Sequence, residues 1–347
     1  MSMTISERPG VYTDYSVSGV VRASAGGGAV GLAATARGGD ANEVVAVTDH
    51  GAALSAFTGG NLPALAKILL ANGASVVYCV RVDETGEGAP DYAAAFGKLM
   101  AAEGVRFMVC DSHDALVHAA MKEAIDGADE RSRYRVGFVE SDESGAAGLV
   151  ERASALNSER MVLVSHHETE GTPGAVAAAV CGAAAGESDP ALPLNGAALS
   201  ALGAIGGNFS DADIAAMVRG GVLPVETSGG AVCILRGVTT RTTTDGVPDA
   251  VWRELNTVLI LNEVIPGIRD VLRANFSRVK NNARTRGAIR TRVVIELENY
   301  LAREIIDGYD SVTAEQSEDD GSICVVSFGF TVTHGLNIIR LSASITV

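Results

Sequence analysis

The stretch "ASAGGGAVGLAATARGGD" (residues 23–40) consists almost entirely of Gly and Ala, and its central part decides the fold. "AVGLAATARG" (29–38) predicts a strand of small residues buried on both faces, because Gly and Ala allow a close approach of neighbouring backbones. The strand is expected to end at the Gly-Gly-Asp turn of residues 38–40 and to open the folded body. The glycines before it, from Gly26, are expected to form a flexible joint.

The same stretch contains Gly26-x-Gly28-x-x-Gly31, and Asp49 follows at the end of "EVVAVTD". This spacing is typical of dinucleotide-binding proteins, in which a helix follows the glycine loop. Here only "LAATAR" separates Gly31 from the next glycine pair, whereas a parallel crossover needs about a dozen residues or more. The pattern therefore favours the buried strand, with an NAD(P)-binding oxidoreductase using Gly26–Gly31 as the alternative.

Beyond this strand, short apolar runs alternate with helical segments such as "LPALAKILLANG" and "DYAAAFGKLMAAEG". This alternation predicts an α/β layer with parallel strand pairing. The expected strands lie at 29–36, 44–49, 75–82, 105–111, 134–140 and 160–165. Residues 187–210 are expected to form a loop, and 221–240 a hairpin that turns at Ser228-Gly229-Gly230.

The two ends of the chain have a different pattern. Residues 248–306 predict helices, with a break at Pro266-Gly267 and with Pro248 and Pro266 in first helical turns. "SICVVSFGFTV" (322–332) and "NIIRLSASITV" (337–347) alternate with period two and predict strands. We therefore expect a mixed α/β (α+β) protein with an N-terminal arm (1–25), an outer α/β domain (26–235) and an inner core domain (236–347), in which a terminal β-hairpin and C-terminal arm occupy 311–347.

The net charge of −15 argues against nucleic-acid binding by the molecule as a whole. The five cysteines form no CxxC pair and are expected to be buried free thiols. "MSMTISERPG" lacks the apolar region of a secretory signal, and "PGAVAAAVCGAAAG" (173–186) is too short to span a bilayer, so no membrane insertion is expected.

Two histidine clusters are candidate sites. Asp114 and His118, beside His113, are four residues apart and could share a helix face, but a helix cap with solvent-facing histidines is favoured. His166, His167 and Glu168 are adjacent, so on a strand their side chains would diverge, and an exposed loop is favoured. No catalytic motif is present, and we expect no enzyme activity, no cofactor and no metal.

The strongest charge feature is residues 269–292, where eight basic residues are opposed only by Asp270, giving +7 against −22 for the rest of the chain. If one helix spans this region, Arg269, Arg273, Lys280 and Arg284 fall within about 60° of one another, beside an apolar face. This predicts a basic stripe that docks onto an acidic partner. A nucleic-acid-binding structural protein is a further alternative, although no nucleic-acid motif accompanies the stripe.

Four segments together resemble contractile tail sheath proteins of phage tails, tail-like bacteriocins and related injection machines. They are "ERPGVYTDYSVSG" (7–19), "GAVGLAATARGGDANEVVAVT" (28–48), "GVTTRTTTDG" (237–246) and "KNNARTRGAIRTRVVIELENYLAREIIDG" (280–308). The resemblance covers roughly residues 8–50 and 236–347, whereas the middle agrees only in its α/β pattern.

The resemblance implies a structural subunit that polymerises in stacked helical rings around an inner tube and contracts to drive the tube through a cell envelope. It implies contact of Arg269, Arg273, Lys280 and Arg284 with the tube, and strand exchange through the two arms. It also implies baseplate and tail terminator proteins as partners, and assembly in the bacterial cytoplasm as part of a virion tail or tail-like particle. The arm residues expected to pair with neighbouring subunits are Val11, Tyr12, Tyr15, Val17, Ile339, Leu341, Ala343, Ile345 and Val347.

Overall fold

The computed structural model describes residues 28–82, 90–129, 134–168, 171–206, 209–276 and 278–337. The predicted N-terminal arm (1–25) and the predicted C-terminal strand residues from Ile339 to Val347 lie outside the described residues.

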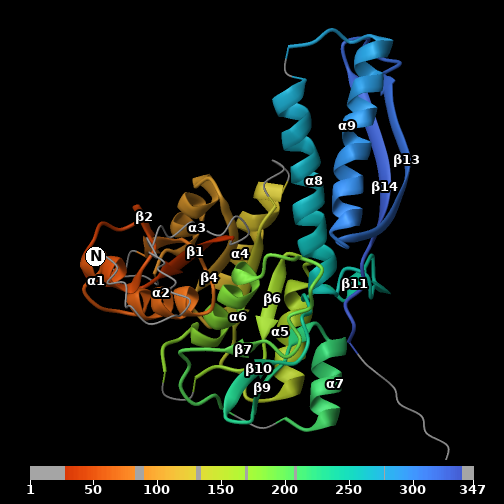
Figure 1. The fold of residues 1–347 in the computed structure, drawn as a ribbon. Helices are drawn as coiled ribbons and strands as arrows, with labels where there is room; N and C mark the ends of the chain where they lie inside the picture. Colours follow the sequence, from red (N-terminus) through yellow and green to blue (C-terminus); the bar gives the residue numbers. More distant parts are fainter. Residues whose placement is uncertain are drawn as a thin grey trace, which may run out of the picture.

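A seven-stranded sheet forms the centre of the larger body, in the order β2-β3-β1-β4-β5-β6-β8 (Figure 1). All neighbouring strands are parallel except β2 and β3, which are antiparallel. The strands are β1 (Ala29–Ala34), β2 (Val44–Val47), β3 (Val77–Arg81), β4 (Val105–Cys110), β5 (Val136–Glu140), β6 (Met161–Val164) and β8 (Val222–Leu223). The strand of small residues is therefore confirmed, and it lies inside the sheet between β3 and β4.

Helices cover both faces of this sheet. The apolar core on one face includes α1 (His50–Ala56), α2 (Leu62–Ala71) and α6 (Ala175–Gly186). The core on the other face includes α3 (Tyr92–Ala101), α4 (Ala115–Asp129), α5 (Ala146–Leu156) and α7 (Asp211–Arg219). The Ala-rich segment that is too short to span a membrane is thus the buried helix α6. Its small residues matter for packing, because a Cβ at Gly182 would lie 2.7 Å from the carbonyl oxygen of Leu69 in α2.

The predicted hairpin at 221–240 is confirmed in part. β9 (Val225–Ser228) and β10 (Ala231–Ile234) pair antiparallel across Gly229 and Gly230, whose φ angles are +59° and +85°. Two consecutive positive φ angles suit a tight two-residue hairpin turn, and glycine adopts them without strain. β7 (Ala198–Leu199), which lies in the segment 187–210 expected to be a loop, pairs antiparallel with β10.

The C-terminal part is a layer of two long helices and a hairpin. Helices α8 (Leu255–Asn275) and α9 (Ala283–Ala302) lie side by side, and the hairpin of β13 (Ile306–Gln316) and β14 (Cys324–Val332) lies along α9 (Figure 1). A separate apolar core holds these elements together, with Val264, Ile268, Val293 and Leu297 buried within it. The short strands β11 (Thr243–Thr244) and β12 (Val247–Pro248) precede α8.

The structure corrects the predicted helix boundaries. Helix α8 runs through Pro266 without a break, and Pro248 lies in strand β12 rather than in a helical turn. Buried Val264 and Ile268 flank Pro266, so packing on α9 holds the helix together where proline removes one backbone hydrogen bond. The interruption comes later, where Asn282 caps α9 by accepting a hydrogen bond from the Thr285 N–H at 3.0 Å.

The hairpin also differs from the prediction. Helix α9 ends at Ala302, and Ile306 begins a strand that the helical pattern had included. That strand, β13, is the partner of β14, so the hairpin begins before residue 311.

Candidate interaction surfaces

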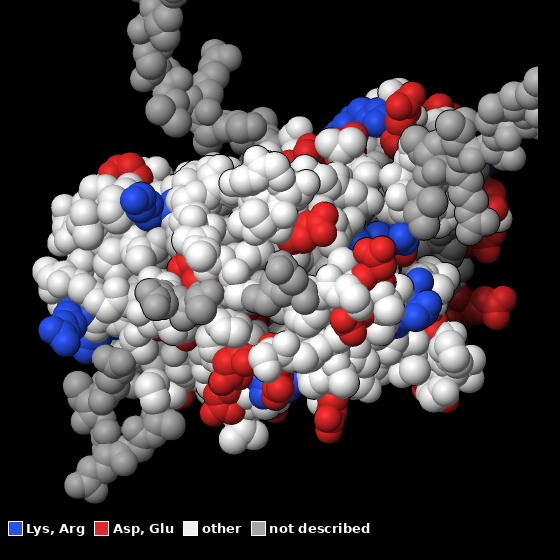
Figure 2. Space-filling model, turned by 90° about the horizontal axis from the view of Figure 1, so that it is seen from below, with Lys and Arg blue, Asp and Glu red and all other residues white. Residues whose placement is uncertain are grey.

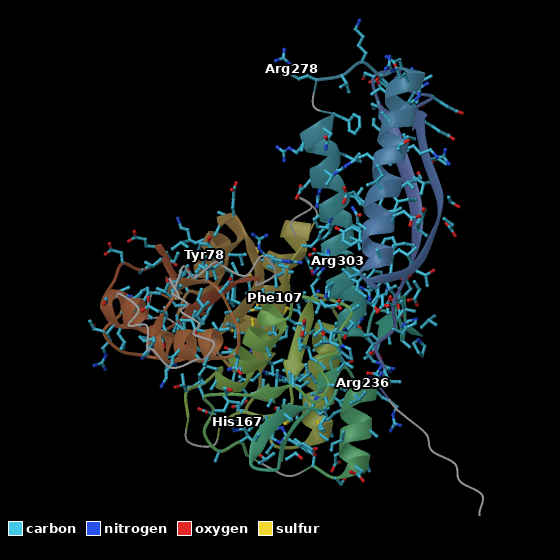
Figure 3. The ribbon with its side chains drawn as sticks, viewed as in Figure 1. Tyr78, Phe107, His167, Arg236, Arg278 and Arg303 are labelled. Carbon is cyan, nitrogen blue, oxygen red and sulfur yellow. The ribbon has the colours of Figure 1, made fainter. Side chains whose placement is uncertain are left out.

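The glycines of the first strand serve packing. The N–H of Gly28 donates a hydrogen bond to the carbonyl oxygen of Ala185 at 2.9 Å, and a Cβ there would lie 2.7 Å from the ring of Phe107 (Figure 3). Gly31 lies within β1, enclosed by Leu99 and Val105. No helix follows directly from β1, which continues to β2. The N–H of Gly28 is thus already bonded within the protein and Gly31 lies inside a strand rather than in a phosphate-binding loop, whereas Gly26 lies outside the described residues.

Asp49, the acidic residue of the dinucleotide pattern, has a local role. Its Oδ1 accepts a hydrogen bond from the Ala52 N–H at 2.8 Å and caps α1. Such a cap satisfies one of the free N–H groups at the start of a helix. The acidic residue of the dinucleotide-binding spacing therefore marks a helix start.

Two buried carboxylates lie at the carboxyl ends of β4 and β5, where open α/β sheets bind ligands. Asp111 accepts four hydrogen bonds, two from Thr35, one from Asn61 at 2.9 Å and one from the Tyr92 hydroxyl at 2.6 Å. Each oxygen of Asp111 is thus already bound by the protein. The network ties β1, α2 and α3 to the end of β4.

Glu140 lies at the end of β5 and is 1% exposed. Its Oε1 accepts from the Gly174 N–H at 2.6 Å, and its Oε2 accepts from the N–H groups of Val176 and Ala177 at 2.9 and 3.0 Å. His113 Nε2 lies 2.9 Å from Oε1. Glu140 therefore caps the buried start of α6, where a negative charge also interacts favourably with the helix dipole.

The prediction of solvent-facing histidines is wrong for His118. His118 is 1% exposed, and its Nε2 lies 2.7 Å from the carbonyl oxygen of Ser112. Burial lowers the pKa of His118 to about 4. Asp114 does have the expected role near a helix start, since its Oδ1 accepts from the Leu116 N–H.

The prediction of an exposed loop at 165–171 is also wrong for its first residues. His166 is 4% exposed and packs edge-on against Phe209, with its Nδ1 2.7 Å from Ser165 Oγ. The ring centroids of His167 and His113 lie 5.7 Å apart (Figure 3). In the described part of the chain, no three His, Cys, Asp or Glu side chains are placed to hold a metal ion.

Three of the cysteines are buried free thiols as predicted, namely Cys79, Cys110 and Cys181, while Cys233 and Cys324 are partly exposed. Desolvation raises the pKa of Cys79 and of Cys110 to about 12. Such thiols are poor nucleophiles, because the thiolate is the reactive form.

The predicted basic stripe does not follow one helix. Arg269 and Arg273 lie on α8, which ends at Asn275, whereas Lys280 lies in the following loop and Arg284 in the first turn of α9. The periodicity of a single helix therefore does not apply between residues 276 and 282. The four basic residues form two pairs in different surroundings.

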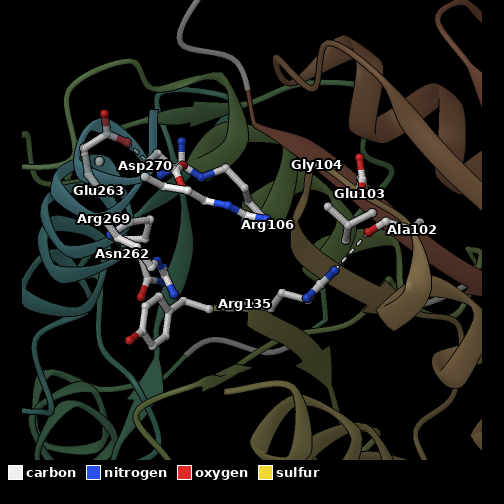
Figure 4. Close-up of a pocket in the computed structure, with 14 residues that line it drawn as sticks. Ala102, Glu103, Gly104, Arg106, Arg135, Asn262, Glu263, Arg269 and Asp270 are labelled. Atoms are coloured by element: carbon white, nitrogen blue, oxygen red, sulfur yellow. Dashed lines mark hydrogen bonds and ion pairs between the residues drawn. The ribbon is translucent and has the colours of Figure 1, made fainter. Parts of the chain in front are cut away.

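Arg269 and Arg273 line a cleft of about 1000 Å³ between α8 and the strand starts of the α/β body (Figure 4). Tyr134 also lines this cleft, and its ring lies under two guanidinium groups, with Arg160 at 4.9 Å and Arg269 at 5.5 Å from the ring centre. Arg106 pairs with Glu263 of α8 at 2.9 Å. The cleft is thus a joint between the two bodies, crossed by a cation–π pair and an ion pair.

The loop between α8 and α9 lies beside the turn between β13 and β14, and together we call residues 278–286 and 315–325 the tip. Asn281 Nδ2 donates to the carbonyl oxygens of Gly321 and Ile323 at 2.9 and 3.1 Å. Arg286 Nη1 lies 3.3 Å from Gln316 Oε1. Figure 3 places Arg278 at this end, far from the α/β body.

The opposite end of the molecule differs in its charge pattern. Figure 2 views that end and shows single acidic and basic side chains scattered among uncharged surface. No helix within the described ranges is both long and apolar enough to cross a membrane.

Comparison with known proteins agrees with the resemblance seen in the sequence. Residues 247–346 match the model of the phage tail sheath C-terminal domain family. No curated protein sequence matches the chain.

Three solved structures share the fold of nearly the whole chain. A chain of the anti-feeding prophage baseplate is similar with a TM-score of 0.77 at 14% identity, covering 99% of this chain and 100% of that one. The contracted helical sheath of the same system gives 0.73 at 14% identity, covering 98% and 99%. The sheath tail protein of Desulfitobacterium hafniense gives 0.69 at 12% identity, covering 93% and 100%. The chain therefore has the mixed α/β fold of contractile sheath proteins, as predicted.

Proposed function

We propose that this chain, with the fold of a contractile sheath protein and a sheath C-terminal domain, is the structural subunit of a contractile tail sheath. It polymerises around an inner tube and contracts to drive that tube through a target envelope. The observation that carries the proposal is the combination of a family match over residues 247–346 with a shared fold over nearly the whole chain.

The hairpin β13–β14 supports polymerisation by strand addition. Within the described residues it is a two-stranded sheet with α9 on one face, so the outer edges of β13 and β14 carry no paired strand. Exposed strand edges are templates for strands of other chains. We propose that the N-terminal arm and the residues after Asn337 supply these strands to neighbouring copies.

The mechanism is conformational. Subunits assemble around the tube in an extended lattice, and a signal from the baseplate releases one ring, whose arms pull the next ring into a wider and shorter lattice. The free energy is stored during assembly, so no nucleotide hydrolysis takes part and the chain is not an enzyme. A tail terminator limits the polymer, and assembly takes place in the bacterial cytoplasm.

The tube contact is narrower in this proposal than the predicted stripe. Arg273 is exposed at the end of α8 and has no ion pair within the described part of the chain, and Arg269 lies one turn before it. Lys280 and Arg284 lie at the tip beside acidic residues, which offset their attraction for an acidic tube. We therefore propose that Arg269 and Arg273 face the tube, through weak polar contacts that release during contraction.

The first test is polymer formation by the purified protein. Electron microscopy is expected to show tubes or helical filaments, whereas truncations lacking 1–19 or 336–347 stay folded but monomeric. Far-UV circular dichroism checks the fold of each truncation. Monomers of the full chain at every salt and protein concentration, with or without tube protein, would rule out the proposal.

The second test concerns the tube. Arg273→Glu is expected to weaken co-sedimentation with tube protein and to reduce its dependence on salt. Arg219→Glu, an exposed arginine at the end of α7, is the matched control and should bind as the native protein does. Equal binding by both variants would remove Arg273 from the tube contact.

A further inference from the structure

The tip carries both signs of charge in two separate segments. Residues 278–286, which comprise the end of the loop after α8 and the first turn of α9, contain only basic charges, and we call them the basic loop. Residues 315–320, which comprise the end of β13 and the turn after it, contain only acidic charges, and we call them the acidic turn. The four basic residues are Arg278, Lys280, Arg284 and Arg286, and the four acidic residues are Glu315, Glu318, Asp319 and Asp320. The net charge of the tip is therefore zero, in a chain whose net charge is −15.

The two segments are held side by side, but their charges are not paired with each other. Hydrogen bonds from Asn281 to Gly321 and Ile323 fix the turn against the loop. Among the described residues, no ion pair joins the basic set to the acidic set. Seven of the eight charged side chains belong to exposed residues, and Arg286 is partly buried. One copy therefore presents two adjacent, complementary charge sets to its surroundings.

Aliphatic side chains lie between and beside these charges. Val279 of the loop is 52% exposed, and Ile323 and Val325 of the turn and β14 are 50% and 47% exposed. A small apolar centre with a charged rim is the usual composition of a protein–protein interface. The tip thus has the features of a contact surface for another protein.

We infer that the tip is a contact between copies of this chain, in which the acidic turn of one copy packs against the basic loop of the next. The inference rests on the proposed function, because it needs a polymer in which copies repeat side by side. The partner follows from charge complementarity, since a second copy already carries both the basic and the acidic surface. Loop and turn occupy different parts of the tip, so the contact is head-to-tail and can repeat from copy to copy. Charge pairing of this kind sets the register of neighbouring copies.

The test uses two charge-reversal variants of the full-length chain. In one, the loop becomes acidic like the turn through Arg278→Glu, Lys280→Glu and Arg284→Glu. In the other, the turn becomes basic like the loop through Glu315→Lys, Glu318→Lys and Asp319→Lys. Each variant alone places like charges at every contact, and we expect the protein concentration needed for polymer growth to rise about tenfold or more. A mixture of equal amounts is expected to polymerise near the native concentration, because alternating copies restore opposite charges at each contact.

The mixture distinguishes contacts between copies from contacts within one copy. Mixing two variants can restore opposite charges between neighbouring copies, but it cannot restore them within a single copy. The control carries Glu123→Lys, Asp142→Lys and Glu151→Lys at three exposed residues of the α/β body. It changes the net charge by the same amount as the variant with the basic turn and should polymerise normally. Thermal unfolding of each variant confirms that the reversals leave the fold intact. Native-like growth of either reversal variant, or no recovery in the mixture, would overturn the inference while leaving the sheath proposal intact. A native protein that never polymerises would overturn both.

Discussion

Replacing Glu140 tests whether a single buried carboxylate holds the start of α6 in the core. Glu140→Ala removes the acceptor of three backbone N–H groups, those of Gly174, Val176 and Ala177, all of which belong to buried residues. Loss of an ordinary exposed helix cap costs about 0.5–2 kcal/mol. Here the donors lose their partner out of reach of bulk water, so we expect a loss of about 3–5 kcal/mol in the free energy of unfolding.

Glu140→Gln keeps the shape but replaces one oxygen with an NH₂ group. The NH₂ group of the new side chain is a hydrogen-bond donor and cannot accept a hydrogen bond. It then faces N–H donors, either those of Val176 and Ala177 or that of Gly174. We expect a loss of about 2 kcal/mol, between the native protein and the alanine variant. Glu143→Gln is the control, because Glu143 is exposed in the loop after β5.

Urea unfolding followed by circular dichroism measures these losses as shifts of the midpoint at constant slope. Amide exchange should speed up first in the opening turn of α6, at residues 175–178. A loss below about 1 kcal/mol for Glu140→Ala would show that water or a rearranged loop replaces the carboxylate, and would refute the reasoning.

Three further changes probe other contacts. Burial lowers the pKa of His118 from 6.5 to about 4. Between these pH values the unfolded chain binds more protons than the folded chain, so the free energy of unfolding should fall as the pH drops. In urea titrations a His118→Gln variant should show a flatter dependence of this free energy on pH. Gly137→Ala in β5 places a Cβ within 2.9 Å of three side-chain atoms and should cost about 1–2 kcal/mol in thermal or urea unfolding, unless those flexible ends move aside at no cost. Tyr134→Ala removes the ring that Arg160 and Arg269 share. It should lower the free energy of unfolding by about 1–2 kcal/mol and speed amide exchange in α8 near residue 266. Unchanged exchange would show that the joint does not depend on this ring.

Much of the α/β body could be predicted, because its strands are continuous apolar runs flanked by helical segments. Such runs are typical of strands buried on both faces, and the order of strands and helices follows directly. The glycine spacing of residues 26–31 wrongly suggested a dinucleotide site, whereas the high Gly and Ala content of the stretch correctly indicated a closely packed strand. Gly28 has no room for a side chain beside Phe107, and a larger residue than Gly31 would press on Leu99.

The histidine surroundings could not be predicted from spacing. His118 and His166 are buried because the residues around them, Ser112 and Phe209, come from other parts of the chain or other turns. Glu140 escaped notice for the same reason, since its partners at the start of α6 follow it by 34 to 37 positions. A lone Glu closing an apolar run was the signal that could have identified it.

The sequence by itself determined the alternation of strands and helices, the burial of the small-residue strand and the resemblance of both ends to sheath proteins, because local periodicity and composition encode these features. Only the tertiary structure decided where the C-terminal helices break. Burial of Val264 and Ile268 stabilises α8 on both sides of Pro266, so the helix continues through the proline. Asn282 caps a new helix, and the predicted basic stripe is therefore divided between two helices and the loop between them. The structure also placed the acidic turn beside the basic loop, since hydrogen bonds from Asn281 join segments about 40 residues apart.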